Sequence, residues 1–252
     1  MHVMNITDSF DMIFGNKERI LVVMPHPDDT ELYCGATVSR LVKAGKKMRV
    51  VKMTFGDRGS KKEEISQRRL REIREKEDRA AMRILGIQKE DNIYLGIGDG
   101  EVEDDLSTIG KVAYQIRIFK PELIITTNPQ DCIIRFQKDI NWINHRDHRN
   151  TGKVVLDAAY PYARDLLFFP EHFKDSLAVS HACTEFLLVD YYDHSDLVYI
   201  DVTDFVEVRT KALASHASQY SFKHSQESTD FFTKLPEYGK KRFERFRYVV
   251  AD

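Results

Sequence analysis

The fold of this chain is decided by the stretch Leu21-Val22-Val23-Met24-Pro25-His26-Pro27-Asp28-Asp29-Thr30-Glu31. Its first four residues are an apolar run of the length typical of a buried parallel strand. The proline after His26 favours an extended conformation there and does not fit a helix interior, so the strand must end at this point. Asp28 or Asp29 can cap a following helix over residues 32–41. The stretch therefore predicts a polar cluster at a strand-to-helix turn, where open parallel sheets bind ligands.

Apolar runs and helical patterns alternate along the rest of the chain. The expected strands cover residues 46–54, 92–95, 123–127, 185–189 and 198–202, and the expected helices cover 62–85, 106–119 and 206–217, with a further helical pattern through 154–159. The charges of the helix over 62–85 are expected to be a solvated face. The alternation predicts an α/β fold with a mostly parallel sheet and helices on both faces. A length of 252 residues without a recognisable linker favours a single domain over 1–252.

Composition narrows the possible partners and the compartment. The 38 Lys and Arg residues balance 40 Asp and Glu residues, which gives no basic excess for nucleic acid or an anionic membrane. Cys34, Cys132 and Cys183 lie far apart and are odd in number, which indicates a reducing compartment and a cytoplasmic protein. Residues 1–15 lack an apolar signal core, and no later run approaches ~18 apolar residues, so we expect neither secretion nor membrane insertion.

The segment 130–144 is apolar, although its position predicts a loop over the strand ends. Such a loop can be a lid or a contact between subunits of a homo-oligomer. A plain packed excursion explains the same composition equally well. The sequence leaves these alternatives open.

A second polar cluster, His145-Arg146-Asp147-His148, opens the helix that follows this segment. Imidazole nitrogens and a carboxylate oxygen are ligands that zinc accepts, commonly as three protein ligands with water in the fourth position. The sequence therefore predicts a metal site with His26, Asp29 and His148 as ligands. A site of two histidines and one carboxylate also suits Fe²⁺.

The remaining polar residues of the two clusters are candidates for catalysis. Asp28 can accept a proton from the attacking water, and the helix N-terminus favours the anionic form of both aspartates. His145 and His148 share a face if the helix begins by His145, so either could reach the metal. If His148 is the ligand, His145 is free to stabilise an oxyanion. Asp147 can orient His145 or support a ligand, and spacing alone does not separate these roles.

Each residue taken alone also has a purely structural interpretation. His26 can be a satisfied turn residue, Asp28 and Asp29 can be caps, and residues 145–148 can be a polar helix start. Two such clusters, each at a predicted strand-to-helix turn, favour the metal site over this interpretation.

At these residues the chain resembles the PIG-L or LmbE-like zinc-dependent de-N-acetylases. The resemblance rests on the Pro-His-Pro-Asp-Asp-x-Glu turn at 25–31 and on the His-x-Asp-His motif at 145–148. Further matching motifs are Arg74-x-x-Glu77, Asp99-Gly100, Lys120-Pro121-Glu122 and Ala212-Leu213-x-x-His216-x-Ser218-Gln219.

The resemblance implies a Rossmann-like three-layer sandwich and removal of an N-acetyl group from an amino-sugar conjugate, usually a glucosamine conjugate. It implies Zn²⁺ as the metal, Asp28 as general base and later proton donor, and His145 as the group that stabilises the tetrahedral intermediate. Arg58 and Asp99 become candidates for binding sugar hydroxyls. The alternative is that Arg58 forms a salt bridge within its loop and that Asp99 is a structural acid in a turn.

Two departures from the family pattern bear on these implications. Gly35-Ala36 stands where the family often has two glycines, a small-for-small change with little expected consequence. The long segment 132–144 predicts a different pocket entrance. Hydrolysis of another amide or acyl bond at the same metal site, or a non-catalytic sugar-binding role, therefore stays an alternative.

Overall fold

The apolar run at 21–24 lies in the middle of a seven-stranded sheet. In this computed structural model, which describes residues 6–60, 64–137 and 139–251, the run belongs to β1. The strands of the sheet are β1 (Arg19–Met24), β2 (Lys47–Thr54), β3 (Asn92–Ile97), β4 (Leu123–Thr126), β7 (Glu185–Leu188), β8 (Leu197–Asp201) and β9 (Phe243–Val250). Every residue of β1 after the first is buried, as a central parallel strand requires.

The strands lie in the order β3-β2-β1-β4-β7-β9-β8. β1 pairs in parallel with β2 and β4, so that Val22 lies beside Val50 on one side and Ile125 on the other. β9 is antiparallel to both of its neighbours. The chain builds outward from β1 through β2 to β3 and then crosses to β4, so β1 and β4 flank the point where the strand order reverses. Ligands bind at such points in open sheets.

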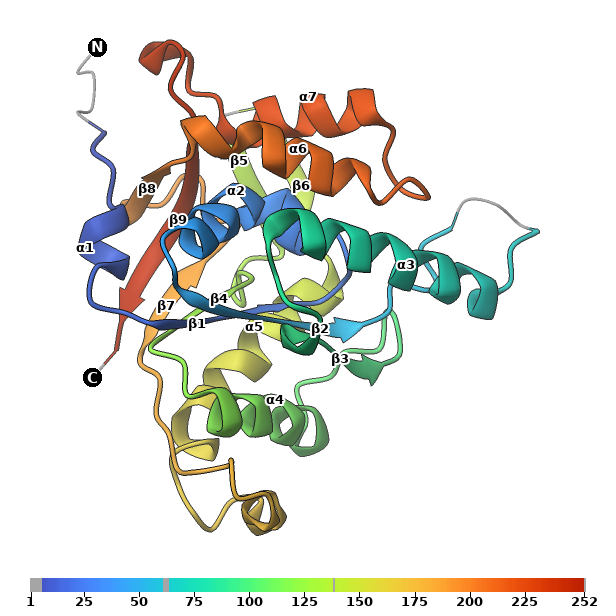
Figure 1. Cartoon of the computed structure of the whole chain (residues 1–252), viewed down its shortest axis with the longest axis vertical. Coiled ribbons are helices and arrows are strands. Elements are labelled where there is room, and N and C mark those ends of the chain that lie inside the picture. The colour runs from blue at the N-terminus through green and yellow to red at the C-terminus, as the bar shows by residue number, and fades with distance from the viewer. Residues whose placement is uncertain (1–5, 61–63, 138, 252) are drawn as a thin grey trace.

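Helices cover both faces of the sheet (Figure 1). One face is packed by α1 (Phe10–Phe14), α2 (Asp29–Lys43), α3 (Gln67–Leu85) and α6 (Val206–Ala214), with α7 (Phe222–Thr233) lying against α6. The other face is packed by α4 (Leu106–Phe119) and α5 (Arg146–Asp157). Short helical turns lie at Lys89–Asp91, Ala158–Tyr162, Pro170–Lys174, Thr203–Phe205 and Pro236–Tyr238. The predicted three-layer α/β fold is confirmed. No helix within the described residues is long and apolar enough to cross a membrane.

The expected elements are confirmed with shifted ends. α3 begins at Gln67 rather than at residue 62, because the side chain of Ser66 accepts the backbone N–H of Arg69 and starts the helix there; residues 61–63 lie outside the described residues. β3 continues through Gly96 to Ile97 opposite an irregularity in β2. α7 and β9 were not expected from the sequence.

The apolar segment 130–144 is a β-hairpin rather than the expected loop. β5 (Ile133–Gln137) pairs antiparallel with β6 (Ile140–Ile143), and residue 138 lies outside the described residues. Phe136 stacks on Phe231 of α7 with ring centroids 4.2 Å apart. The inward side of the hairpin is thus packed, while Ile133 and Ile143 remain exposed.

A buried ion pair joins α2 to the C-terminal part of the sheet. Glu244 of β9 accepts the backbone N–H groups of Ala36 and Thr37 at 3.1 and 2.7 Å. Its partner Arg209 of α6 lies 3.3 Å away and donates to the carbonyl of Leu32. Both charged side chains are buried, so they are held in place by each other and by the backbone of α2.

Gly152 allows α5 to approach the end of β4 closely. A Cβ at this position would lie 2.5 Å from the carbonyl oxygen of Thr127 and 2.9 Å from the nitrogen of Pro129. The Thr127 hydroxyl also donates to the carbonyl of His148 at 2.6 Å. Gly152 therefore fixes the position of α5, and with it His148, relative to β4.

We expect Gly152→Ala to destabilise the protein by roughly 1–3 kcal/mol, because the added methyl group forces α5 away from the backbone of β4. Urea unfolding of the two proteins measures the difference. Gly35→Ala is the matched control, since a Cβ there has its nearest contact at 3.5 Å and fits ordinary packing. Equal stability of Gly152→Ala and the unchanged protein would contradict the close approach.

Candidate metal centre

The turn after β1 and the start of α5 bring together the three predicted ligands, His26, Asp29 and His148. The backbone N–H of His26 donates to Asp29 Oδ2 at 2.9 Å, and His26 Nδ1 lies 3.2 Å from the same oxygen. His148, in the first turns of α5, places Nε2 at 3.5 Å from Asp29 Oδ1. One ligand atom from each of the three residues lies within 4.8 Å of the others. Two imidazoles and a carboxylate in this arrangement fit a zinc or ferrous ion.

The surroundings hold two of these groups in the state that a metal requires. Burial acts to raise the pKa of Asp29, but the imidazoles of His148 and His26 lower it to about 2, so the group is a carboxylate. Burial lowers the pKa of His148 to about 4 against the opposing effect of Asp29, so the imidazole is neutral at pH 7. Deprotonated ligands bind a metal without first losing a proton.

The other side of His26 is surrounded by carboxylates. Its Nε2 lies 3.2 Å from Asp147 Oδ2 and 3.3 Å from Asp99 Oδ1. Burial opposes protonation, yet Asp147, Asp29 and Asp99 raise the pKa of His26 well above its usual value. A metal bound at Nδ1 would replace the proton there, while the N–H at Nε2 donates to Asp147, which is how metal-binding histidines are commonly held.

Asp147 contacts His26 through its side chain. Its fully buried carboxylate also accepts the backbone N–H groups of Gly100 and Val102 at 2.8 and 3.2 Å. Its backbone N–H donates to His145 Nδ1 at 3.2 Å, and one ligand atom each of His26, His145 and Asp147 lies within 4.8 Å of the others. His145 is therefore the N-cap of α5, and its exposed ring lies 5.2 Å from that of His26 between centroids.

Asp28 departs from one sequence expectation. Neither Asp28 nor Asp29 caps α2 with its side chain within the described residues; Asp28 instead adopts φ +96° and accepts from Arg74 Nη2 at 2.9 Å. Burial raises the pKa of Asp28 to about 6, although the guanidinium of Arg74 opposes this shift. Loss of water thus acts against the anionic form that the helix N-terminus favours, and a pKa of about 6 still leaves Asp28 mainly a carboxylate at pH 7.

Arg74 was not predicted as a site residue. It is buried in α3, and it donates to the carbonyl of Pro27 as well as to Asp28. Gly56, with φ +60°, leaves the space for it, since a Cβ there would lie 2.8 Å from Arg74 Cζ. The prediction of a wholly solvated charged face on this helix is wrong at Arg74 and at the equally buried Asp78. The Arg74-x-x-Glu77 motif was the available signal.

Arg58 and Asp99 meet at the edge of the cluster. Asp99 Oδ2 accepts the backbone N–H of Arg58 at 2.8 Å, while its other oxygen faces His26. The Arg58 guanidinium donates to the carbonyl of Asp99 at 2.9 Å and pairs with Glu101 at 2.5 Å. Asp99 thus lies inside the cluster, and the half-exposed guanidinium of Arg58 lies at its rim.

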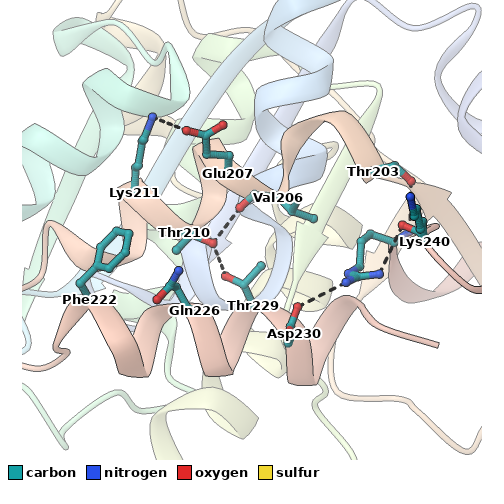
Figure 2. A pocket seen from close by; sticks show the side chains of 11 residues that line it. Thr203, Val206, Glu207, Thr210, Lys211, Phe222, Gln226, Thr229, Asp230 and Lys240 are labelled. Atoms are coloured by element: carbon teal, nitrogen blue, oxygen red, sulfur yellow. Dashed lines mark hydrogen bonds and ion pairs between the residues drawn. The ribbon is translucent and has the colours of Figure 1, made fainter. Parts of the chain in front are cut away.

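A separate hollow of about 470 Å³ lies between α6 and α7 (Figure 2). None of the predicted site residues lines it. Lys211 pairs with Glu207 at 2.6 Å, and Arg242 lies 3.6 Å from Asp230. The charged side chains that line this hollow are thus largely paired with one another. At the end of β1, by contrast, side chains that can bind a metal converge. The latter is the candidate functional site.

Known proteins resemble the chain over most of its length. The family model of the GlcNAc-PI de-N-acetylases (PIG-L) matches residues 21–159. Diacetylchitobiose deacetylase of Thermococcus kodakarensis is 25% identical over 82% of this chain and 72% of its own length. Mycothiol S-conjugate amidase of Streptomyces coelicolor is 25% identical over 80% and 82%. The structure of N,N'-diacetylchitobiose deacetylase from Pyrococcus horikoshii superimposes with a TM-score of 0.78 at 24% identity, covering 94% of this chain and 85% of that one.

We expect Asp147→Asn to weaken zinc binding about 10- to 100-fold, because His26 loses the carboxylate that fixes its N–H and ring orientation. Competition with a chromophoric chelator measures the dissociation constant. Asp157→Asn, an exposed change on the same helix, is the control and should bind zinc as the unchanged protein does. Unaltered affinity in Asp147→Asn would mean that this contact does not support a ligand.

Proposed function

Because this chain belongs to the PIG-L family of GlcNAc-PI de-N-acetylases, we propose that it is a metal-dependent hydrolase of amino-sugar conjugates. It removes an N-acetyl group and releases acetate and a free amine. The observation that carries the proposal is the convergence of His26, Asp29 and His148 beside the buried carboxyl of Asp28. The alternative of a non-catalytic sugar-binding protein is disfavoured, because every group that the reaction requires is present.

In this proposal His26 Nδ1, Asp29 and His148 Nε2 hold a divalent ion, with Zn²⁺ preferred and Fe²⁺ compatible. When bound, such an ion supplies a Lewis acid that polarises the amide carbonyl and lowers the pKa of water. Asp147 keeps His26 turned toward the ion through its bond to Nε2. The buried and neutral His148 needs no deprotonation before it binds.

Asp28 is the proposed general base and later proton donor. A carboxyl with a pKa of about 6 can both accept and return a proton near neutral pH. Arg74 holds the carboxylate in one orientation through the 2.9 Å bond to Oδ2. The other proposed catalytic residue is His145: with Nδ1 accepting the N–H of Asp147, its Nε2 is left as a donor for the oxyanion of the tetrahedral intermediate.

The substrate is proposed as an N-acetylglucosamine-type conjugate, with Asp99 inside the cluster and Arg58 at its rim contacting sugar hydroxyls. The name of the T. kodakarensis relative supports an acetylated amino sugar. The S. coelicolor relative is an amidase of a thiol conjugate, so cleavage of another amide bond is the second candidate. The hairpin of β5 and β6 directly precedes His145, and we propose it as a lid or as a contact between subunits of a homo-oligomer. Because it would shape the pocket entrance, it favours retaining the second candidate.

The compartment proposed for this activity is the cytoplasm. All three cysteines are free, with Cys34 and Cys183 buried and Cys132 exposed. Thiols persist in this form in a reducing environment.

Removal of the metal is expected to abolish acetate release. Protein dialysed against a chelator is assayed on a panel of N-acetylated amino-sugar conjugates, before and after addition of Zn²⁺ or Fe²⁺. Activity should return with one equivalent of the correct ion per chain. Full acetate release by protein shown to be free of metal would refute the metal-dependent reaction, and release of a different acid would favour the second candidate.

We expect Asp28→Asn to lower kcat for acetate release by about 10²- to 10⁴-fold, because the amide cannot accept the proton of the attacking water. The variant should still bind one metal ion, since the three ligands are intact. Asp104→Asn, an exposed acid on a nearby loop, controls for the loss of a negative charge. A kcat equal to that of the unchanged protein in metal-loaded Asp28→Asn would rule out this base.

A further inference from the structure

His216 belongs to the late motif that the proposed reaction does not use. It follows α6 and is completely buried, and its Nε2 lies 3.2 Å from Oε1 of Glu31, which is also completely buried. Burial acts to lower the pKa of His216, but Glu31 raises it, which favours an imidazolium paired with Glu31. Glu31 lies on the first turn of α2, two residues after the proposed ligand Asp29.

A second buried ion pair lies beside the first. Lys52 Nζ of β2 lies 2.9 Å from Asp78 Oδ1 of α3, and both side chains have no exposed surface. The other oxygen of Asp78 accepts from Asn92 and Tyr94 at 2.8 and 2.5 Å. The cluster therefore contains two cations and two anions contributed by four separate segments of the chain.

The same donors invite a second interpretation as a metal site. Atoms of Glu31, Asp78 and His216 lie within 4.8 Å of one another. Among the described residues, Glu31 Oε2 and His216 Nδ1 have no hydrogen-bond partner. The ammonium of Lys52, however, already neutralises Asp78. A dication bound beside this pair would have only Glu31 to balance it, which leaves a buried positive charge without a counterion. The balance of charge favours ion pairs over a metal.

The pair acts on the turn that carries the proposed catalytic groups. The first turn of α2 begins where the backbone N–H of Leu32 donates to the carbonyl of Asp28 at 2.9 Å. Arg74 of α3 binds this turn at Asp28, and His216 binds it three residues further along at Glu31. The His216 loop is itself tied down, because Ser218 donates through its backbone N–H and its hydroxyl to Glu77 of α3, both at 2.7 Å.

We propose that His216 is a positioning residue, which fixes the first turn of α2 through Glu31 and thereby sets the directions of the Asp28 and Asp29 side chains. Its effect on catalysis rests on the proposed function, whereas its effect on metal affinity does not. Within the described residues, the pair is the hydrogen bond that joins the late motif to an acid of the turn. Loss of the pair leaves the turn anchored by Arg74, by the bond from His26 to Asp29 and by the α6 contact to Leu32.

The test separates positioning from stability. His216→Gln leaves Glu31 buried without a cation and should destabilise the fold. The double variant Glu31→Met/His216→Leu replaces both charges by apolar groups, which commonly restores stability. His224→Gln, an exposed histidine on α7, is the matched control. Each protein is measured for melting temperature, zinc affinity and stoichiometry, and kcat and KM for acetate release.

We expect the double variant to melt near the temperature of the unchanged protein yet to bind zinc about 10-fold more weakly, because the turn that carries Asp29 is fixed by fewer contacts. Its kcat should fall with little change in KM. Recovery of zinc affinity and kcat together with the melting temperature would overturn the proposal, since the pair would then only stabilise the fold. A second zinc equivalent that disappears in His216→Gln would overturn it in favour of a metal site. If the unchanged protein releases no acetate, the proposed function fails, and the zinc affinities still decide the role of His216.

Discussion

Two adjacent aspartates must point in different directions, and the rest of the site depends on this constraint. The backbone meets it by placing Asp28 at φ +96°, a conformation that costs a residue with a Cβ roughly 1–3 kcal/mol. The cost is offset because Arg74 binds both the carbonyl of Pro27 and the carboxylate of Asp28. Arg74 can be there only because Gly56, at the end of β2, has no side chain. The conformation of one turn after β1 thus determines what β2 and α3 must contribute.

The electrostatics of the site follow from how carboxylates are distributed around one imidazole. His26 has Asp29 on its Nδ1 side and Asp147 with Asp99 on its Nε2 side. Asp147 joins this group to the loop before α4 through the backbone N–H groups of Gly100 and Val102. The second polar cluster, this loop and the turn after β1 thus form one hydrogen-bonded unit. A metal ion bound at His26 Nδ1 would balance the charge of Asp29. On the Nε2 side, the carboxylate of Asp147 already accepts hydrogen bonds from backbone N–H groups.

The sequence was sufficient where chemistry is local and insufficient where it depends on contacts between distant segments. The convergence of His26, Asp29 and His148 could be predicted because proline, histidine and acid types at strand-to-helix turns allow few alternatives. Arg74 could not be separated from the many charged residues of α3, because its burial depends on Gly56 and Asp28, which belong to other elements. β9 was missed because Glu244 and Arg245 interrupt its apolar pattern; both are accommodated by partners that only the folded structure supplies. Residues 133–143 were predicted to form a loop because they lie between a strand and the helix that follows it, although their residue types favour strands.

The contact of β9 with α2 has a consequence for the order in which the protein is made. Glu244 lies at the centre of the ion pair that fastens the middle of α2, and it is synthesised long after the turn that α2 carries. On the ribosome, a nascent chain that has not yet reached β9 has Arg209 without its carboxylate and α2 without this anchor. The helix that carries Asp29 is fastened to this part of the sheet only when β9 enters between β7 and β8.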